Sequence, residues 1–229
     1  MAFSKRSFSL FIFDLDGTLI DSKADIACGM NLALARMNMQ PLPIDRVAEF
    51  IGDGVQNLIE RALRAISGSE PDPLQVRNCI DLFKEEYGQH LLDQTRLYPQ
   101  ALEALDRLSW AKLAVVSNKP EKLSRQILEG LEIAPRFGAI IGGDTTGTRK
   151  PDPGGIFKAM GICRAVPSES MMVGDSPVDI AAGKAAGTYT CGVAGGFRPR
   201  HQLESAECDL LVNNLLELAN KITNDELRT

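Results

Sequence analysis

Residues 10–18 read LFIFDLDGT, an apolar run that ends abruptly in two aspartates, a glycine and a threonine. Four consecutive apolar residues suit a strand that is buried on both faces of a parallel sheet. Asp14 and Asp16 stand two residues apart, so their side chains start on the same side of an extended backbone. The stretch therefore predicts a central strand that brings two carboxylates to one edge of a sheet.

Similar short apolar runs recur along the chain, and each ends in small or polar residues. They lie at 113–116, 139–141, 171–173, 189–193 and 209–212. Helical patterns separate most of them, at 119–131, 153–160, 177–186 and 215–222. This alternation of strand and helix predicts an α/β fold with a doubly wound parallel sheet.

One interval is too long for a simple strand–helix–strand unit. About 100 residues separate Asp16 from Ser117, whereas such a unit needs roughly 30. The surplus shows helical spacing of apolar residues, and its helical segments are 21–39, 55–66 and 73–92. We therefore predict a small α-helical domain at 20–93, inserted after the first strand into a core formed by 1–19 and 94–229.

Composition narrows the classes of function. The 229 residues include 25 Lys and Arg against 30 Asp and Glu, a net charge of −5. Clustered positive charge is what binds a phosphate backbone, so this balance argues against a nucleic-acid partner. No apolar run approaches the ~18 residues of a membrane span. The five cysteines are scattered without a C-x-x-C pair, which favours reduced thiols and a cytoplasmic protein.

The candidate chemistry lies where the predicted strands end, because ligands of open α/β sheets bind outside the carboxyl ends of the strands. Asp14 and Asp16 would meet Ser117, Lys150 and Asp175 there. One carboxylate can attack phosphorus, and a second can donate and then accept a proton. The carboxylates outnumber the single ammonium, and a hard divalent cation, most simply Mg²⁺, would relieve the repulsion of an incoming phosphate.

The same positions resemble the four motifs of the haloacid dehalogenase-like phosphatases. Residues 13–19, FDLDGTL, are similar to the first motif, and Ser117, Lys150 and residues 174–179, GDSPVD, are similar to the other three, in the same order. The resemblance implies a Rossmann-like core, and the predicted helical insert stands where the family carries its cap domain.

The resemblance also implies roles for individual residues. Asp14 would be the nucleophile and Asp16 the general acid and base, with Lys150 neutralising charge. The Mg²⁺ ligands would be the Asp14 carboxylate, the Asp16 carbonyl and the Asp175 carboxylate. The Ser117 hydroxyl and the Asn118 backbone N–H would bind the phosphate.

Asp179 has two possible roles. In the run Ser176–Asp179 it stands at the third position of a helix whose N-cap is Ser176, so it can be a capping residue. By resemblance it is also a metal-site residue, and both roles can hold together.

The helical insert carries the segment 51–55, IGDGV, at a loop-to-helix junction. This segment, together with NKP at 118–120, resembles the phosphoglycolate phosphatase branch. It makes Gly52, Asp53 and Gly54 candidates for substrate binding, with Arg61 a candidate partner for a substrate carboxylate. The insert is expected to act as a mobile lid that selects small phosphorylated metabolites, with 2-phosphoglycolate the first candidate.

Other functions remain open at this point. A dehalogenase of the same fold lacks the second aspartate, which is present here as Asp16. A sugar-phosphate phosphatase or phosphomutase keeps both aspartates, and a regulatory protein on the same scaffold needs none of them. Either a monomer or a homodimer is compatible with the sequence.

Overall fold

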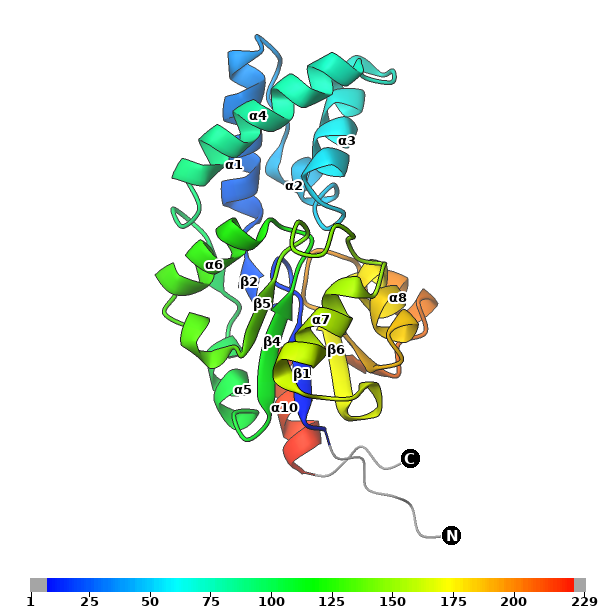
Figure 1. The fold of residues 1–229 in the computed structure, drawn as a ribbon. Coiled ribbons are helices and arrows are strands. Elements are labelled where there is room, and N and C mark those ends of the chain that lie inside the picture. Colours follow the sequence, from blue (N-terminus) through cyan, green and yellow to red (C-terminus); the bar gives the residue numbers. More distant parts are fainter. Residues whose placement is uncertain (1–7, 225–229) are drawn as a thin grey trace. The chain divides into compact units, whose positions relative to one another are not determined.

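A computed structural model of the chain describes residues 8–224. The chain divides into two compact units (Figure 1). One unit contains the described residues up to Ile20 and from Leu97 onward, and the other is Asp21–Arg96.

The larger unit is built on a parallel sheet. Its six strands follow the order β5-β4-β1-β6-β7-β8 among the described residues. Their bounds are β1 Leu10–Phe13, β4 Lys112–Val116, β5 Ala139–Ile141, β6 Ser170–Gly174, β7 Tyr189–Val193 and β8 Leu210–Val212. Every pairing is parallel, and the predicted doubly wound α/β fold is confirmed.

The order of the strands determines which helices share a face. The chain runs outward from β1 through β4 to β5, then returns to β6 beside β1 and continues outward the other way. Right-handed crossovers therefore put the helices before and after β4 on one face and those before and after β6 on the other. The helices are α5 Ala101–Arg107, α6 Glu121–Gly130, α7 Gly154–Cys163, α8 Pro177–Ala185, α9 Arg200–Ser205 and α10 Leu215–Thr223.

The reversal at β1 has a direct consequence for the site. Phe13, the last residue of β1, pairs with Val115 of β4 and with Val173 of β6. The residues that follow these three strands are thereby held level with one another. A reversal of this kind is where open α/β sheets bind their ligands.

Alternate residues of the central strands point into the core under α7 and α8. This cluster consists of Leu10, Ile12, Ala114, Val116, Ala139, Ile141, Ile156, Ala159, Met160, Cys163, Met172, Ala182 and Ala186. All four residues of β1 are buried, as expected for a central strand with both faces covered. The rigid centre of the sheet thus supports the strand ends that carry the site.

The smaller unit is helical, with α1 Lys23–Arg36, α2 Ile44–Ala48, α3 Val55–Ser67 and α4 Pro73–Gln89. The Asp72 side chain caps α4 by accepting from the Leu74 amide at 2.6 Å, and Pro73 occupies the first turn. Buried Asp25 accepts hydrogen bonds from the Gln94 amide and from the Thr95 amide and hydroxyl. Short strands β2 Ile20–Asp21 and β3 Arg96–Leu97 pair with each other.

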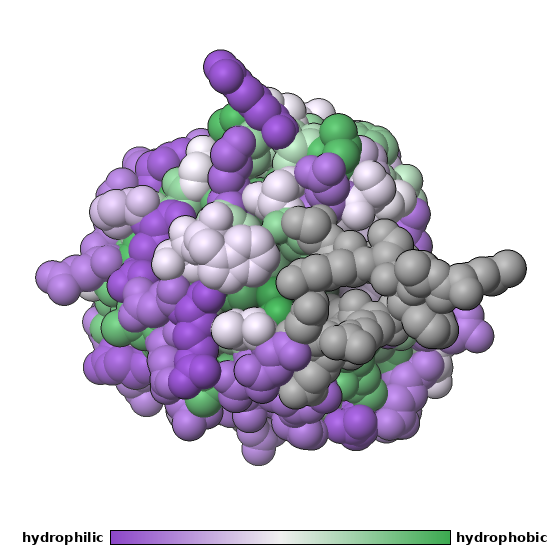
Figure 2. Space-filling view, turned by 90° about the horizontal axis from the view of Figure 1, so that it is seen from below, coloured by the Kyte–Doolittle hydropathy of each residue, from purple (hydrophilic) through white to green (hydrophobic). Residues whose placement is uncertain are grey.

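Hydrophilic residues cover most of the described surface in the view from below, with hydrophobic ones interspersed (Figure 2). Among the described residues, no helix is both long enough and apolar enough to cross a bilayer.

Candidate active site

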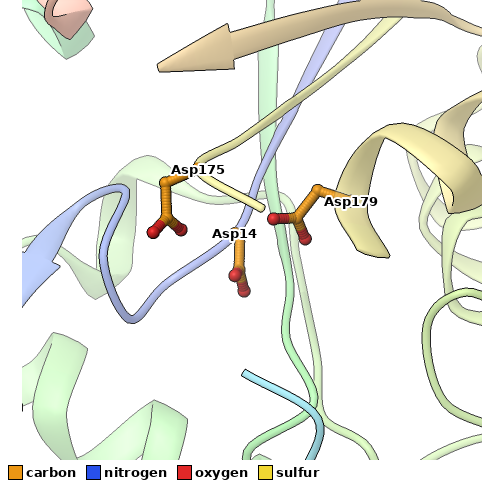
Figure 3. Close-up of side chains that lie close together, drawn as sticks. All are labelled: Asp14, Asp175 and Asp179. Atoms are coloured by element: carbon orange, nitrogen blue, oxygen red, sulfur yellow. The ribbon is translucent and has the colours of Figure 1, made fainter. Parts of the chain in front are cut away.

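Three carboxylates meet at the carboxyl end of the sheet. Asp14 follows β1, Asp175 follows β6, and Asp179 lies in the first turn of α8, and their side chains lie close together (Figure 3). One oxygen from each lies within 4.8 Å of the others, and all three residues are buried. Residues from distant parts of the sequence thus form one acidic cluster.

Lys150 joins this cluster as its cation. Its Nζ lies 2.8 Å from Asp14 Oδ1 and 2.6 Å from Asp179 Oδ1, and its side chain is only 3% exposed. The Asn118 side chain holds the lysine backbone from both directions. Asn118 Oδ1 accepts from the Lys150 amide at 2.8 Å, and Asn118 Nδ2 donates to the Lys150 carbonyl at 3.0 Å. The loop after β4 therefore places the ammonium that faces Asp14.

Asp175 is oriented by two donors and by two glycines. The Thr18 hydroxyl donates to its Oδ1 at 3.2 Å, and the Phe197 amide donates to its Oδ2 at 2.7 Å. A Cβ atom at Gly17 would lie 2.4 Å from Asp175 Oδ2, and one at Gly196 would lie 2.3 Å from Asp175 Cβ. Only glycine fits such close approaches, so the turns after β1 and β7 hold this carboxylate tightly.

Asp179 makes the helix-capping contacts that its sequence position suggests, and its role as a metal-site residue stays a prediction. Its Oδ2 accepts from the Ser176 amide at 3.0 Å and from the Ser176 hydroxyl at 2.6 Å, at the start of α8. Its Oδ1 pairs with Lys150. The carboxylate that caps the helix is therefore also part of the acidic cluster.

Burial and crowding disturb the protonation of the cluster. Burial raises the pKa of Asp14 to about 8, against the opposing effect of Lys150. Burial and the nearby Asp179 charge raise the pKa of Asp175 to about 7. Burial by itself would lower the pKa of Lys150, but the carboxylates of Asp14 and Asp179 raise it above its usual value. One ammonium is too little positive charge for three buried carboxylates.

The donor set suits a divalent cation. Among the described residues, no group donates a well-aligned hydrogen bond to the buried Asp14 Oδ1, although the Lys150 ammonium lies close to it. Hard cations take carboxylate oxygens as ligands, and a second positive charge would allow Asp14 and Asp175 to ionise together. The residues present therefore fit a metal ion held by Asp14 and Asp175, with Asp179 beside them.

Asp16 lies next to a second lysine. Lys119 Nζ is 2.9 Å from Asp16 Oδ1, and the two side chains are 6% and 9% exposed. Ser117 is buried at the end of β4, where its hydroxyl oxygen accepts from the Lys119 amide at 3.3 Å. The predicted phosphate-binding residues Ser117 and Asn118 thus follow the same strand end.

The three candidates in the helical unit lie in one loop before α3. Gly52 and Gly54 adopt positive φ angles of 120° and 88°. Asp53 Oδ2 forms an ion pair of 2.5 Å with Arg61, whose guanidinium also donates to the Phe50 carbonyl at 3.3 Å. Arg61 therefore stabilises its own loop, and substrate binding by Gly52, Asp53 and Gly54 stays a prediction.

Sequence reasoning missed several residues around the cluster. It expected a role for the Asn118 backbone but not for its side chain, and it assigned no role to Lys119, Thr18 or Gly196. The positions of Asn118 and Lys119 directly after Ser117 were a signal for both. Nothing in the local sequence indicates that the Phe197 amide would reach Asp175, 22 residues away.

The arrangement of these residues agrees with comparisons against known proteins. A family model described as haloacid dehalogenase-like hydrolase matches residues 11–193. The chain belongs to the haloacid dehalogenase-like hydrolases. This membership confirms the resemblance of the four motifs and, with it, the enzyme class.

Several relatives within this family are named phosphoglycolate phosphatase. A phosphoglycolate phosphatase of Aquifex aeolicus is 38% identical over 191 residues, which are 82% of this chain and 85% of that protein. One of Pseudomonas fluorescens (strain Pf0-1) is 35% identical over 213 residues, covering 91% of this chain and 78% of the relative. The crystal structure of a predicted phosphoglycolate phosphatase from Haemophilus somnus matches with a TM-score of 0.87 and 31% identity, over 94% of this chain and 98% of that one.

Proposed function

We propose that this hydrolase is a Mg²⁺-dependent phosphatase that cleaves small phosphomonoesters through an aspartyl phosphate on Asp14, with 2-phosphoglycolate its preferred substrate. The observation that carries the proposal is the buried cluster of Asp14, Asp175 and Asp179 around Lys150. A buried nucleophile beside a fixed cation and a candidate metal site is suited to attack on a phosphoryl group.

The reaction would proceed in two steps. Asp14 attacks the phosphorus, the bond between phosphorus and the ester oxygen breaks, and Asp16 gives its proton to the departing oxygen. Asp16 then takes a proton from water, whose oxygen attacks the phosphorus and releases inorganic phosphate. The Asp14 carboxylate is restored, and every proton is accounted for.

The surrounding residues bind and orient the phosphoryl group. Lys150 stays charged between Asp14 and Asp179 and offsets the negative charge of the incoming group. The Ser117 hydroxyl and the backbone N–H of Asn118, both after β4, would donate hydrogen bonds to the phosphoryl oxygens. A Mg²⁺ ion held by Asp14, the Asp16 carbonyl and Asp175 would polarise the phosphoryl oxygens.

The preferred substrate is argued from the relatives. Proteins named phosphoglycolate phosphatase are 32–38% identical to this chain over most of its length. We further propose that the helical domain, predicted at residues 20–93, acts as a lid. Such a lid would exclude large phosphoproteins and nucleic acids. The cytoplasmic location and the monomer or homodimer state stay predictions.

A metal-exchange assay tests the reaction class. With p-nitrophenyl phosphate, EDTA should abolish activity and Mg²⁺ should restore it. Ca²⁺ should inhibit, because the larger ion accepts bidentate carboxylates and would occupy the oxygen that Asp14 uses for attack. Full activity in EDTA, or in Ca²⁺, would contradict the proposed metal site.

A substrate panel tests the specificity separately. The kcat/KM for 2-phosphoglycolate should exceed those for sugar phosphates and p-nitrophenyl phosphate. Conversion of a sugar phosphate into its isomer would indicate a phosphomutase instead. If another metabolite is cleaved far faster, the preferred substrate is wrong while the reaction class stands.

A further inference from the structure

The proposed reaction assigns no work to Lys119, although this residue has an unusual environment. Its side chain is 6% exposed, and its Nζ lies 2.9 Å from Asp16 Oδ1. Lysine is almost never fully buried unless it is paired, because removing an ammonium from water is costly. The burial of a second lysine at the strand ends is therefore costly, which suggests that Lys119 has a function in the site.

Lys119 and Lys150 form ion pairs with different carboxylates. Lys150 contacts Asp14 and Asp179, on the side where the phosphoryl group would be bound. Lys119 contacts Asp16, the residue that would protonate the ester oxygen. The positive charge of Lys119 is thus placed on the side of the leaving group.

Distances support this division. A proton donor lies about 2.6–3.2 Å from the atom that it protonates. Because Lys119 Nζ is 2.9 Å from Asp16 Oδ1, it falls within about 6 Å of the ester oxygen when Asp16 Oδ1 is the atom that donates the proton. In a phosphomonoester of a 2-hydroxy acid, one carbon separates the ester oxygen from the carboxyl carbon, roughly 2.5 Å away.

We propose that Lys119 binds an anionic group of the leaving group and selects esters that carry such a group next to the ester oxygen. In the substrate-free enzyme Asp16 pairs with the ammonium, and in the complex the substrate carboxylate joins or replaces it. The buried charge then has a partner in both states, which avoids the cost of an isolated ion. This inference rests on the proposed function and deepens it, because it names the residue that distinguishes charged from neutral leaving groups.

A purely structural role makes a different prediction. If Lys119 only positions Asp16, its removal should harm all substrates alike. If it binds the leaving group, the loss should depend on the charge of that group. A matched pair of substrates, 2-phosphoglycolate and its carboxamide, differs in this charge and hardly in size.

The test compares wild-type enzyme, Lys119→Met and Lys119→Arg on both substrates. Lys119→Met should lower kcat/KM for 2-phosphoglycolate about 100-fold relative to the carboxamide, because it removes a buried partner of the carboxylate. Lys119→Arg keeps the charge and should restore part of the preference. Equal losses on the two substrates would overturn the proposal. If Lys119→Met shows no cooperative thermal unfolding, Lys119→Gln takes its place.

A binding measurement separates this inference from the proposed function. In the Asp14→Asn background, calorimetric titration gives the dissociation constants of both esters without turnover. Adding Lys119→Met should weaken binding of 2-phosphoglycolate at least tenfold more than binding of the carboxamide, and equal weakening would again overturn the proposal. Failure of the proposed function would instead show as a wild-type enzyme that cleaves neither ester.

Discussion

Asp14 is a buried carboxylate, with 6% of its surface exposed, and it lies next to the Lys150 ammonium. Its pKa is raised by burial, and Lys150 opposes this effect without cancelling it. The negative charge that Asp14 would need as a nucleophile therefore destabilises the folded protein unless a metal ion or a proton is bound.

Replacing this carboxylate by an amide tests its role directly. Asp14→Asn should lower kcat by about 10⁴-fold or more, because an amide is not a nucleophile. The metal-free variant should unfold at a temperature no lower than wild type, since a buried charge is removed. Steady-state kinetics and a thermal melt provide the two readouts. The exposed Asp106 is the control, and Asp106→Asn should leave kcat unchanged.

We expect the Asn118 side chain to act through Lys150. Its side-chain amide forms two hydrogen bonds with the backbone of Lys150. Asn118→Ala should lower kcat about 100-fold through misplacement of the ammonium, and should lower the free energy of unfolding by about 1–3 kcal/mol through the unpaired backbone groups. Asn220→Ala in α10, which removes a hydrogen bond from the Arg107 guanidinium of α5, is the matched control. A folded Asn118→Ala enzyme with wild-type kcat would contradict the positioning role.

At the scale of elements, the turns after β1 and β7 enclose Asp175 between two glycines and two hydrogen-bond donors. Such a carboxylate is pre-oriented, so little conformational entropy is lost when it binds a metal ion. The loop after β7 thereby contributes to the site through its backbone.

Crowding this loop should weaken metal binding. Gly196→Ala would place a Cβ atom 2.3 Å from Asp175 Cβ and displace the carboxylate. We expect the Mg²⁺ concentration for half-maximal activity to rise about tenfold or more, as for loss of an orienting partner of a metal ligand. Gly161→Ala in α7, where a Cβ atom meets open space, should leave this concentration unchanged. An unchanged Mg²⁺ requirement in folded Gly196→Ala would contradict the role of the loop.

For the whole molecule, the acidic cluster makes the free energy of unfolding depend on pH. The raised pKa values of Asp14 and Asp175, about 8 and 7, exceed the ordinary value of 3.8. In the pH range between these values the folded metal-free state binds more protons than the unfolded state, so its stability falls as pH rises.

Mg²⁺ should reverse this trend, because the proposed metal site would bind it through ionised carboxylates. The increase in Tm that Mg²⁺ causes should be larger near about pH 8 than near about pH 5. Asp175→Asn should lose most of this increase. Thermal melts in EDTA and in excess Mg²⁺ at both pH values measure the difference. An increase of equal size at the two pH values would indicate that the cluster does not titrate in this range.

The central part of the fold could be predicted from short stretches of chain. Residues 10–13 predict β1, and the alternation of apolar runs with helical patterns predicts the doubly wound sheet. The helices α2, α5 and α9 escaped prediction because they contain only 5 to 7 residues, too few to show a clear period.

The sequence by itself determined the strand ends that Asp14, Ser117 and Asp175 follow, and Lys150 lies in the long loop between β5 and α7. These follow from local pattern, because buried strands and helix starts depend mainly on neighbouring residues. Only the tertiary structure decided that Asn118 holds Lys150, that Lys119 faces Asp16 and that the Phe197 amide orients Asp175. Each of these contacts joins residues that are far apart in the sequence. Two of them start from neighbouring residues of one loop, Asn118 and Lys119. Their geometry depends on strand register and on the space that glycines leave, which no short stretch of chain specifies.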